Sequence, residues 1–61
     1  MNKTSLIQAV NEMTTYSGIS AARGKDGELV YFNHRVIGAP VKIGLSEAAS
    51  RLFKWGVVVQ P

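Results

Sequence analysis

The 61-residue chain has no cysteine, a single histidine, two prolines and only four acidic residues. Without cysteine, the chain has no disulfide, no zinc–thiolate site and no cysteine nucleophile. The single histidine, His34, has no second imidazole or thiolate with which to complete a transition-metal site. We therefore expect a protein without metal or cofactor that is held together by apolar packing.

Long apolar segments are also missing. No run of about eighteen apolar residues occurs, so the sequence predicts no membrane-spanning helix. Residues 1–5 are polar, and the apolar stretch that follows is broken by Gln8, Asn11 and Glu12, which argues against a signal-peptide core. We expect an intracellular, cytoplasmic protein that has no membrane partner.

Groups that carry out catalysis are sparse. Asp26 and Glu28 are the only acidic residues close together in sequence, and both belong to a predicted turn. The serines and threonines gather at expected helix starts, where capping explains them, and no Gly-x-Ser-x-Gly motif occurs. The segment Gly24–Gly27 lacks the following helix that a phosphate-binding loop requires. We therefore expect no enzymatic activity.

What the chain does contain is a succession of helix and strand signals, which predicts one small α+β domain over residues 1–61. Apolar residues recur every three or four positions over residues 4–15, which predicts a helix that ends near Tyr16, before Gly18. A second helix is predicted over Ser46–Trp55, because Ser46 is a good capping residue. The expected order is α-β-β-β-α-β, with a small antiparallel sheet of three to four strands and two helices on one face.

Extended segments fill the space between these helices. Gly24–Gly27 has the composition of a tight turn and predicts a hairpin. The second arm of this hairpin, Glu28–Phe32, alternates so that Tyr31 and Phe32 point to opposite faces. One face of this strand should pack against the helices. The other face also carries apolar residues, so we expect another element or another protomer to cover it. A third extended segment is expected over residues 36–43, with a bend at its glycine and proline.

The last strand is predicted from Val57–Val59, closed by Gln60 and Pro61. Three consecutive valines strongly favour a strand and would expose apolar groups on both faces. We expect this strand to pair, either within its own sheet or with the sheet of a second molecule. The second arrangement would make a homo-oligomer through the C-terminal strand.

Charge is distributed unevenly along the chain. The net charge is +3, and residues 23–54 hold six of the seven basic residues. Such a basic half attracts nucleic acid or an acidic protein surface, and it also serves solubility. The charge therefore leaves open two kinds of partner.

Two partial resemblances bear on the nucleic-acid alternative. Ser46–Leu52 resembles the first helix of excisionase-like and helix-turn-helix DNA-binding proteins, although no recognition helix fits after Gly56. The order of helix, three strands and helix resembles double-stranded-RNA-binding domains and, in its strands and second helix, the arm-binding domains of phage integrases. The lysine-rich helix start of the RNA-binding family is replaced here by Leu45–Ala48, which carries a negative charge.

The sequence thus predicts a non-enzymatic protein that acts through a protein–protein interface. Its size and lack of reactive groups are typical of accessory or inhibitor proteins of phages and mobile elements. The alternative is a small basic nucleic-acid-binding regulator. Trp55 is either an interface anchor or a core residue, with core packing favoured. The candidate partner-binding residues are Arg23, Lys25, His34, Arg35, Lys42, Trp55 and Val58.

Overall fold

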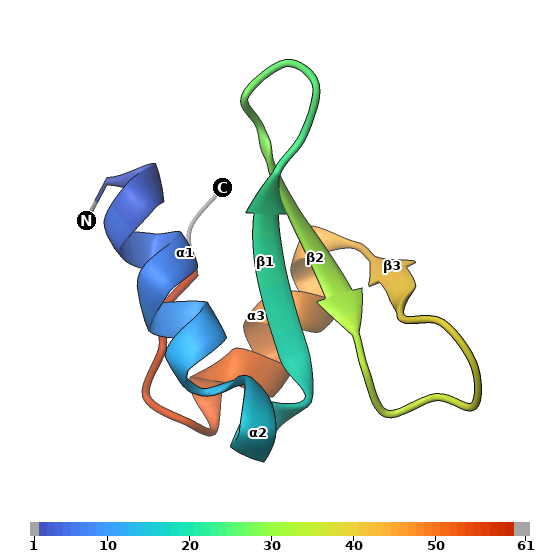
Figure 1. Ribbon diagram of the computed structural model, residues 1–61. Helices are drawn as coiled ribbons and strands as arrows, with labels where there is room; N and C mark the ends of the chain where they lie inside the picture. Colours follow the sequence, from blue (N-terminus) through green and yellow to red (C-terminus); the bar gives the residue numbers. More distant parts are fainter. Residues whose placement is uncertain (1, 60–61) are drawn as a thin grey trace.

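The computed structural model describes residues 2–59 (Figure 1). Its elements are α1 (Lys3–Glu12), α2 (Thr14–Ser17), β1 (Ile19–Arg23), β2 (Leu29–Asn33), β3 (Val41–Ile43) and α3 (Leu45–Phe53). The expected mixed α+β fold with an antiparallel sheet is confirmed. Within the described residues, no helix is both long enough and apolar enough to cross a membrane.

The sheet has the order β1-β2-β3, and both pairs of neighbouring strands are antiparallel. Ala21 of β1 lies opposite Tyr31 of β2, and the next residue, Phe32, lies opposite Lys42 of β3. Tyr31 is buried, whereas Phe32 is half-buried on the other face. Figure 1 shows α1 alongside β1 and α3 behind β1 and β2, so the face that carries Phe32 has no helix over it.

The first predicted helix is divided into α1 and α2 at Met13. Asn2 caps the start of α1, because its side-chain oxygen accepts a hydrogen bond from the Ser5 N–H at 2.8 Å. Met13 leaves the helical conformation, with φ −98° and ψ 4°. The chain then makes one further turn and stops at Gly18, whose φ of 75° is the left-handed conformation expected there.

The second predicted helix begins one residue earlier than expected, at Leu45, with Gly44 as its cap in place of Ser46. It ends in a Schellman motif. Gly56, at φ 80°, donates its N–H to the Phe53 carbonyl at 3.1 Å, and Val57 donates to the Leu52 carbonyl at 3.2 Å. This turn directs the chain back toward the core.

The predicted strand at Val57–Val59 is wrong, because these residues form no strand. The edge of β1 that could have accepted it is already occupied by helix side chains. Asn11 accepts from the Ala21 N–H at 2.8 Å and donates to the Ala21 carbonyl at 3.1 Å, and Thr14 donates to the Ile19 carbonyl at 2.8 Å. The predicted homo-oligomer was to form through this C-terminal strand, and the structure has no strand there. The expected closure by Gln60 and Pro61 lies outside the described residues.

The hydrophobic core lies between the inner face of the sheet and the helices. Val57 belongs to it, at 8% exposure, even though it is not in a strand. Apolar side chains from α1, the sheet and α3 complete the core, which comprises Leu6, Val10, Ile19, Ala21, Tyr31, Ala48, Leu52 and Val57. Of the third extended segment predicted over residues 36–43, only Val41–Ile43 pairs with β2. The preceding residues form a loop.

Candidate functional site

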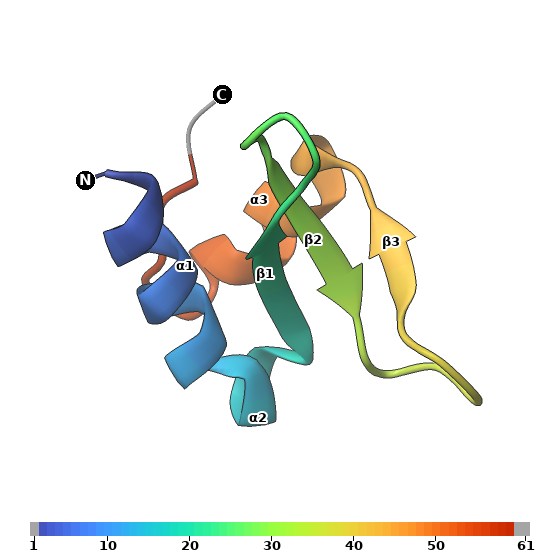
Figure 2. The same cartoon turned by 45° about the horizontal axis from the view of Figure 1, so that its top comes forward.

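The connection between β2 and β3, residues 34–40, projects away from the helices (Figure 2). We call it the arm. Ile37 near its tip is fully exposed, and Val36 is exposed as well. A Cβ added at Gly38 would meet no atom within 4 Å, so the space beside this residue is open. The next strand residue, Val41, is 52% exposed. The arm therefore presents branched apolar side chains to solvent.

The base of the arm is held in place by hydrogen bonds. The His34 N–H donates to the Gly18 carbonyl at 2.7 Å, and the Arg35 N–H donates to the Asn33 side-chain oxygen at 3.0 Å. The Arg35 guanidinium also donates to the Tyr16 carbonyl. Its aliphatic part lies over Gly18, where an added Cβ would come within 2.7 Å of it. A fixed base and an exposed tip are the arrangement of a presented binding loop.

Two of the sequence-predicted residues, Arg35 and Trp55, come together at Tyr16. The Trp55 ring lies 6.2 Å from the Tyr16 ring, with 36° between their planes, and Arg35 binds the Tyr16 carbonyl. Trp55 is 41% exposed and lies outside the core, so the favoured expectation of core packing is wrong. Its ring instead covers one side of Tyr16.

His34 and Lys42 lie toward the uncovered face of the sheet, which we call the open face. Ser20 Oγ and His34 Nε2 are 2.6 Å apart. These two residues border a shallow hollow together with Phe32 and Pro40. The pairing was missed at the sequence level, although the hairpin register brings residues 20 and 34 close once the turn is fixed. Among the described residues, no group of three or more His, Asp and Glu is placed so that it could hold a metal ion.

Arg23 and Lys25 lie at the hairpin end of the sheet, away from the arm (Figure 1). The Arg23 guanidinium donates to Thr4 Oγ at 2.8 Å, which ties the hairpin to α1. Lys25 is exposed in the turn. Val58 is 62% exposed near the end of the described chain. The structure thus distributes the seven predicted residues over several surfaces.

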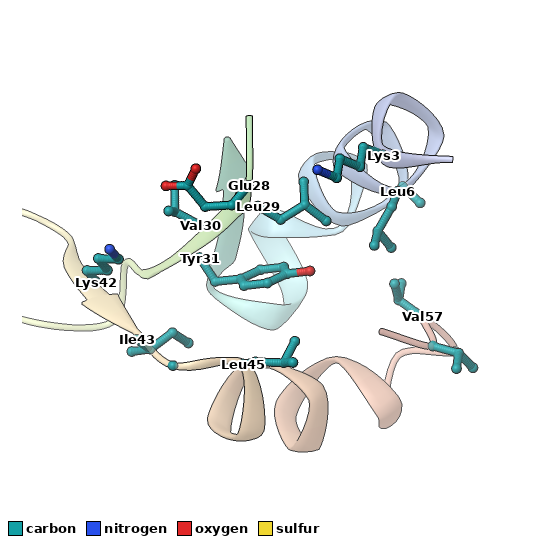
Figure 3. A pocket seen from close by; sticks show the side chains of 14 residues that line it. Lys3, Leu6, Glu28, Leu29, Val30, Tyr31, Lys42, Ile43, Leu45 and Val57 are labelled. Atoms are coloured by element: carbon teal, nitrogen blue, oxygen red, sulfur yellow. The ribbon is translucent and has the colours of Figure 1, made fainter. Parts of the chain in front are cut away.

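A second feature that sequence reasoning missed is a pocket of about 890 Å³ that we call the Tyr31 pocket. It lies between α1, the strands and the end of the chain (Figure 3). Its lining comes from Lys3, Leu6 and Ala9 of α1, from residues 28–31 and 42–45, and from Gly56–Val58. No sequence signal marks it, because its walls come from four separate segments.

Tyr31 is the residue that distinguishes this pocket from ordinary apolar packing. Its side chain is only 3% exposed, yet its hydroxyl has no hydrogen-bond partner within the described part of the chain. Burial raises the pKa of the Tyr31 hydroxyl above its ordinary value. The group therefore stays protonated at neutral pH and remains a donor. A buried polar group without a partner is uncommon in folded proteins.

Comparison with models of protein families, with curated proteins and with solved structures finds no match to this chain.

Proposed function

We propose that this protein is a non-enzymatic binding module that recognises an intracellular protein partner through the arm. The observation that carries the proposal is the exposure of Ile37, together with that of Val36 in the arm and of Val41 at the start of β3. Full burial of one such side chain contributes roughly 1.5–3 kcal/mol. An apolar surface on the partner would supply that burial.

The stiffness of the arm residues adds to this argument. Valine and isoleucine have two heavy atoms on Cβ and therefore few side-chain rotamers to lose on binding. The hydrogen bonds of His34 and Arg35 hold the base of the arm in place. Because the cost of binding includes the ordering of side chains and loops, side chains with few rotamers above an anchored base favour affinity.

A protein that covers a partner's surface in this way acts as an accessory or inhibitor protein. We propose this role, of the kind encoded by phages and mobile elements, on the small size of the chain and on its exposed apolar arm. The prediction that the protein forms homodimers has no strand at residues 57–59 to support it.

The second candidate function is nucleic-acid binding through the open face, favoured by the position of Phe32 directly opposite Lys42. An aromatic ring beside a cation is suited to base stacking and phosphate contact. However, Arg23 and Arg35 hold protein oxygens through their guanidinium groups. Fewer free cations mean fewer phosphates neutralised, and we therefore rank this function second.

The test is an affinity capture from cells of the source, repeated with and without nuclease and analysed by mass spectrometry. The bait is compared with Ile37→Asp and with Gln8→Glu, which adds the same charge at an exposed position of α1. We expect a protein that is retained after nuclease, lost with Ile37→Asp and kept with Gln8→Glu. Circular dichroism should show both variants folded, because neither change touches the core.

Two outcomes contradict the proposal. If the captured protein binds Ile37→Asp as well as it binds the unchanged chain, the arm is not the interface. If capture disappears on nuclease treatment, and purified duplex DNA or RNA binds with an affinity that falls steeply with salt, the open face and its basic residues become the better interpretation.

A further inference from the structure

We propose that the Tyr31 pocket binds a small amphipathic carboxylate of the fatty-acid type, whose carboxylate accepts a hydrogen bond from the Tyr31 hydroxyl. Figure 3 shows this hydroxyl aimed toward Leu6 and Val57, two residues that line the pocket. The hydroxyl oxygen is itself covered by protein atoms, so a ligand carboxylate reaches it only when these side chains move apart. The site lies apart from the exposed tip of the arm. It is a ligand site in addition to the proposed protein interface.

The unpartnered hydroxyl is the first observation that points to a ligand. A donor buried without a partner destabilises the fold, and an acceptor brought in by a ligand removes that cost. A charged acceptor makes a stronger hydrogen bond than a neutral one. The hydroxyl is a donor at neutral pH, since the ordinary pKa of tyrosine is about 10 and burial raises that of Tyr31 further. A carboxylate therefore matches it better than an amine, which would bring a second donor.

The size and the lining of the pocket define the rest of the ligand. A volume of about 890 Å³ lies within the range of small-molecule sites, roughly 300–1,000 Å³. The inner walls are aliphatic, formed mainly by Leu6, Leu29, Ile43 and Val57. An alkyl chain suits these walls, since each methylene that it buries there contributes favourably to binding.

The charges at the pocket favour an anion. Two lysines and one acidic residue, Glu28, line it, but Lys42 lies opposite Phe32 and carries its charge on the open face, so Lys3 is the lining cation on the same side of the sheet as Tyr31. Glu28 already accepts a hydrogen bond from the Asp26 N–H at 2.9 Å. Lys3 donates to the Gly27 carbonyl at 2.8 Å, but an ammonium group has three donors and keeps two for a ligand. Lys3 also lies one helical turn from Leu6, which the hydroxyl faces.

The test uses decanoate below its micelle concentration as the probe, followed by NMR titration of the backbone amides of the full chain. We expect saturable binding, with the largest shifts near Leu6, Tyr31 and Val57. Decyltrimethylammonium, with the same chain and the opposite charge, should bind at least tenfold more weakly. Equal binding of the two probes would overturn the proposal, as would the absence of saturable binding.

Three variants complete the test. Tyr31→Phe should weaken decanoate binding at least tenfold, the loss expected for a hydrogen bond to a charged group, while the chain stays folded because the substitution removes only the orphan hydroxyl. Ala9→Leu should block the pocket, whereas Gln8→Leu, an exposed α1 residue that does not line it, should leave binding unchanged. Unaltered affinity in Tyr31→Phe, or equal effects of the two leucine variants, would overturn the site.

Light scattering separates the ligand from the competing occupant, a second copy of the chain. A monomer that binds decanoate supports the proposal. A dimer that protects the pocket amides from exchange and excludes decanoate overturns it. Ile37→Asp should bind decanoate normally, so a failure of this proposal is distinct from a failure of the arm as an interface.

Discussion

Replacing Asn11 by alanine is the sharpest test of how the sheet edge is closed. The Asn11 side chain acts in place of a neighbouring strand, because it binds both the N–H and the carbonyl of Ala21, at 2.8 and 3.1 Å. A typical intramolecular hydrogen bond contributes about 0.5–1.5 kcal/mol net. Losing both should cost about 1–3 kcal/mol, and the better helix propensity of alanine should offset about 0.5 kcal/mol of that loss.

This loss is large for a chain of this length. At about 0.05–0.15 kcal/mol per residue, 61 residues correspond to a total stability of only about 3–9 kcal/mol. A domain of this size loses about 4–8 °C in Tm for each kcal/mol. The net loss of about 0.5–2.5 kcal/mol should therefore make Asn11→Ala melt about 2–20 °C below the unchanged protein, as measured by thermal unfolding followed by circular dichroism.

The control is Gln8→Ala, on the exposed surface of the same helix. It should change stability by less than about 0.5 kcal/mol. If Asn11→Ala is as stable as Gln8→Ala, water replaces the asparagine without loss, and our explanation for the missing C-terminal strand fails. A second readout is association: an uncovered β1 edge is a pairing surface, so light scattering should show Asn11→Ala self-associating at concentrations where Gln8→Ala stays monomeric.

Three further predictions concern the hydrophobic core and the free energy of unfolding. Leu52→Ala should lower the free energy of unfolding by about 2–5 kcal/mol in urea titrations, because the side chain is fully buried. Val57→Lys should lower the free energy of unfolding by a few kcal/mol, and Val58→Lys should lower it by less than about 0.5 kcal/mol, since only Val57 is buried. Equal effects of the two variants in urea titrations would show that Val57 is not packed in the core. At alkaline pH the unfolded chain releases the Tyr31 proton first, because the folded-state pKa is the higher one. Stability that is present below pH 10 should therefore fall as pH rises above about 10, and it should fall less in Tyr31→Phe.

Local chemistry accounts for the parts of the fold that the sequence predicts well. Gly18 and Gly56 are expected to stop the helices, and both adopt the left-handed conformation, at φ 75° and 80°. The Gly24–Gly27 turn connects β1 and β2, the two strands of the hairpin, as expected. Each of these outcomes depends on the backbone preferences of a few adjacent residues, which the residue types alone predict.

The C-terminal valines show where local preference is overruled. Their β-branched side chains favour a strand, but a strand needs a free edge. Asn11 and Thr14 occupy the edge of β1, and the turn at Gly56 brings Val57 into the core. A polar side chain ten residues from its backbone partner carries no recognisable signal, so this outcome could not be predicted from the sequence.

The candidate sites also differ in whether adjacent residues or distant segments determine them. The exposed arm could have been suspected from apolar residues next to a glycine and a proline, although strand propensity pointed to an extended segment there. The Ser20–His34 pair depends on the register of the hairpin. The Tyr31 pocket depends on the assembly of four segments that are distant in sequence. The alternating pattern of β2 places Tyr31 and Phe32 on opposite faces of the sheet, but it does not predict whether the Tyr31 hydroxyl has a hydrogen-bond partner.

The arm and the pocket share one thermodynamic property. Ile37 is as exposed as it would be in the unfolded chain and so adds nothing to stability, and the unpartnered Tyr31 hydroxyl is buried at a cost, in a chain whose total stability is small. Neither group therefore stabilises the folded state by its own contacts. A partner that needs the folded shape of the arm or of the pocket binds the folded chain and not the unfolded one. Such binding stabilises the fold by about RT ln(1 + [L]/Kd), or roughly 2.7 kcal/mol at a hundredfold excess over Kd. A rise in Tm with a protein partner should disappear in Ile37→Asp, and a rise with decanoate should shrink in Tyr31→Phe.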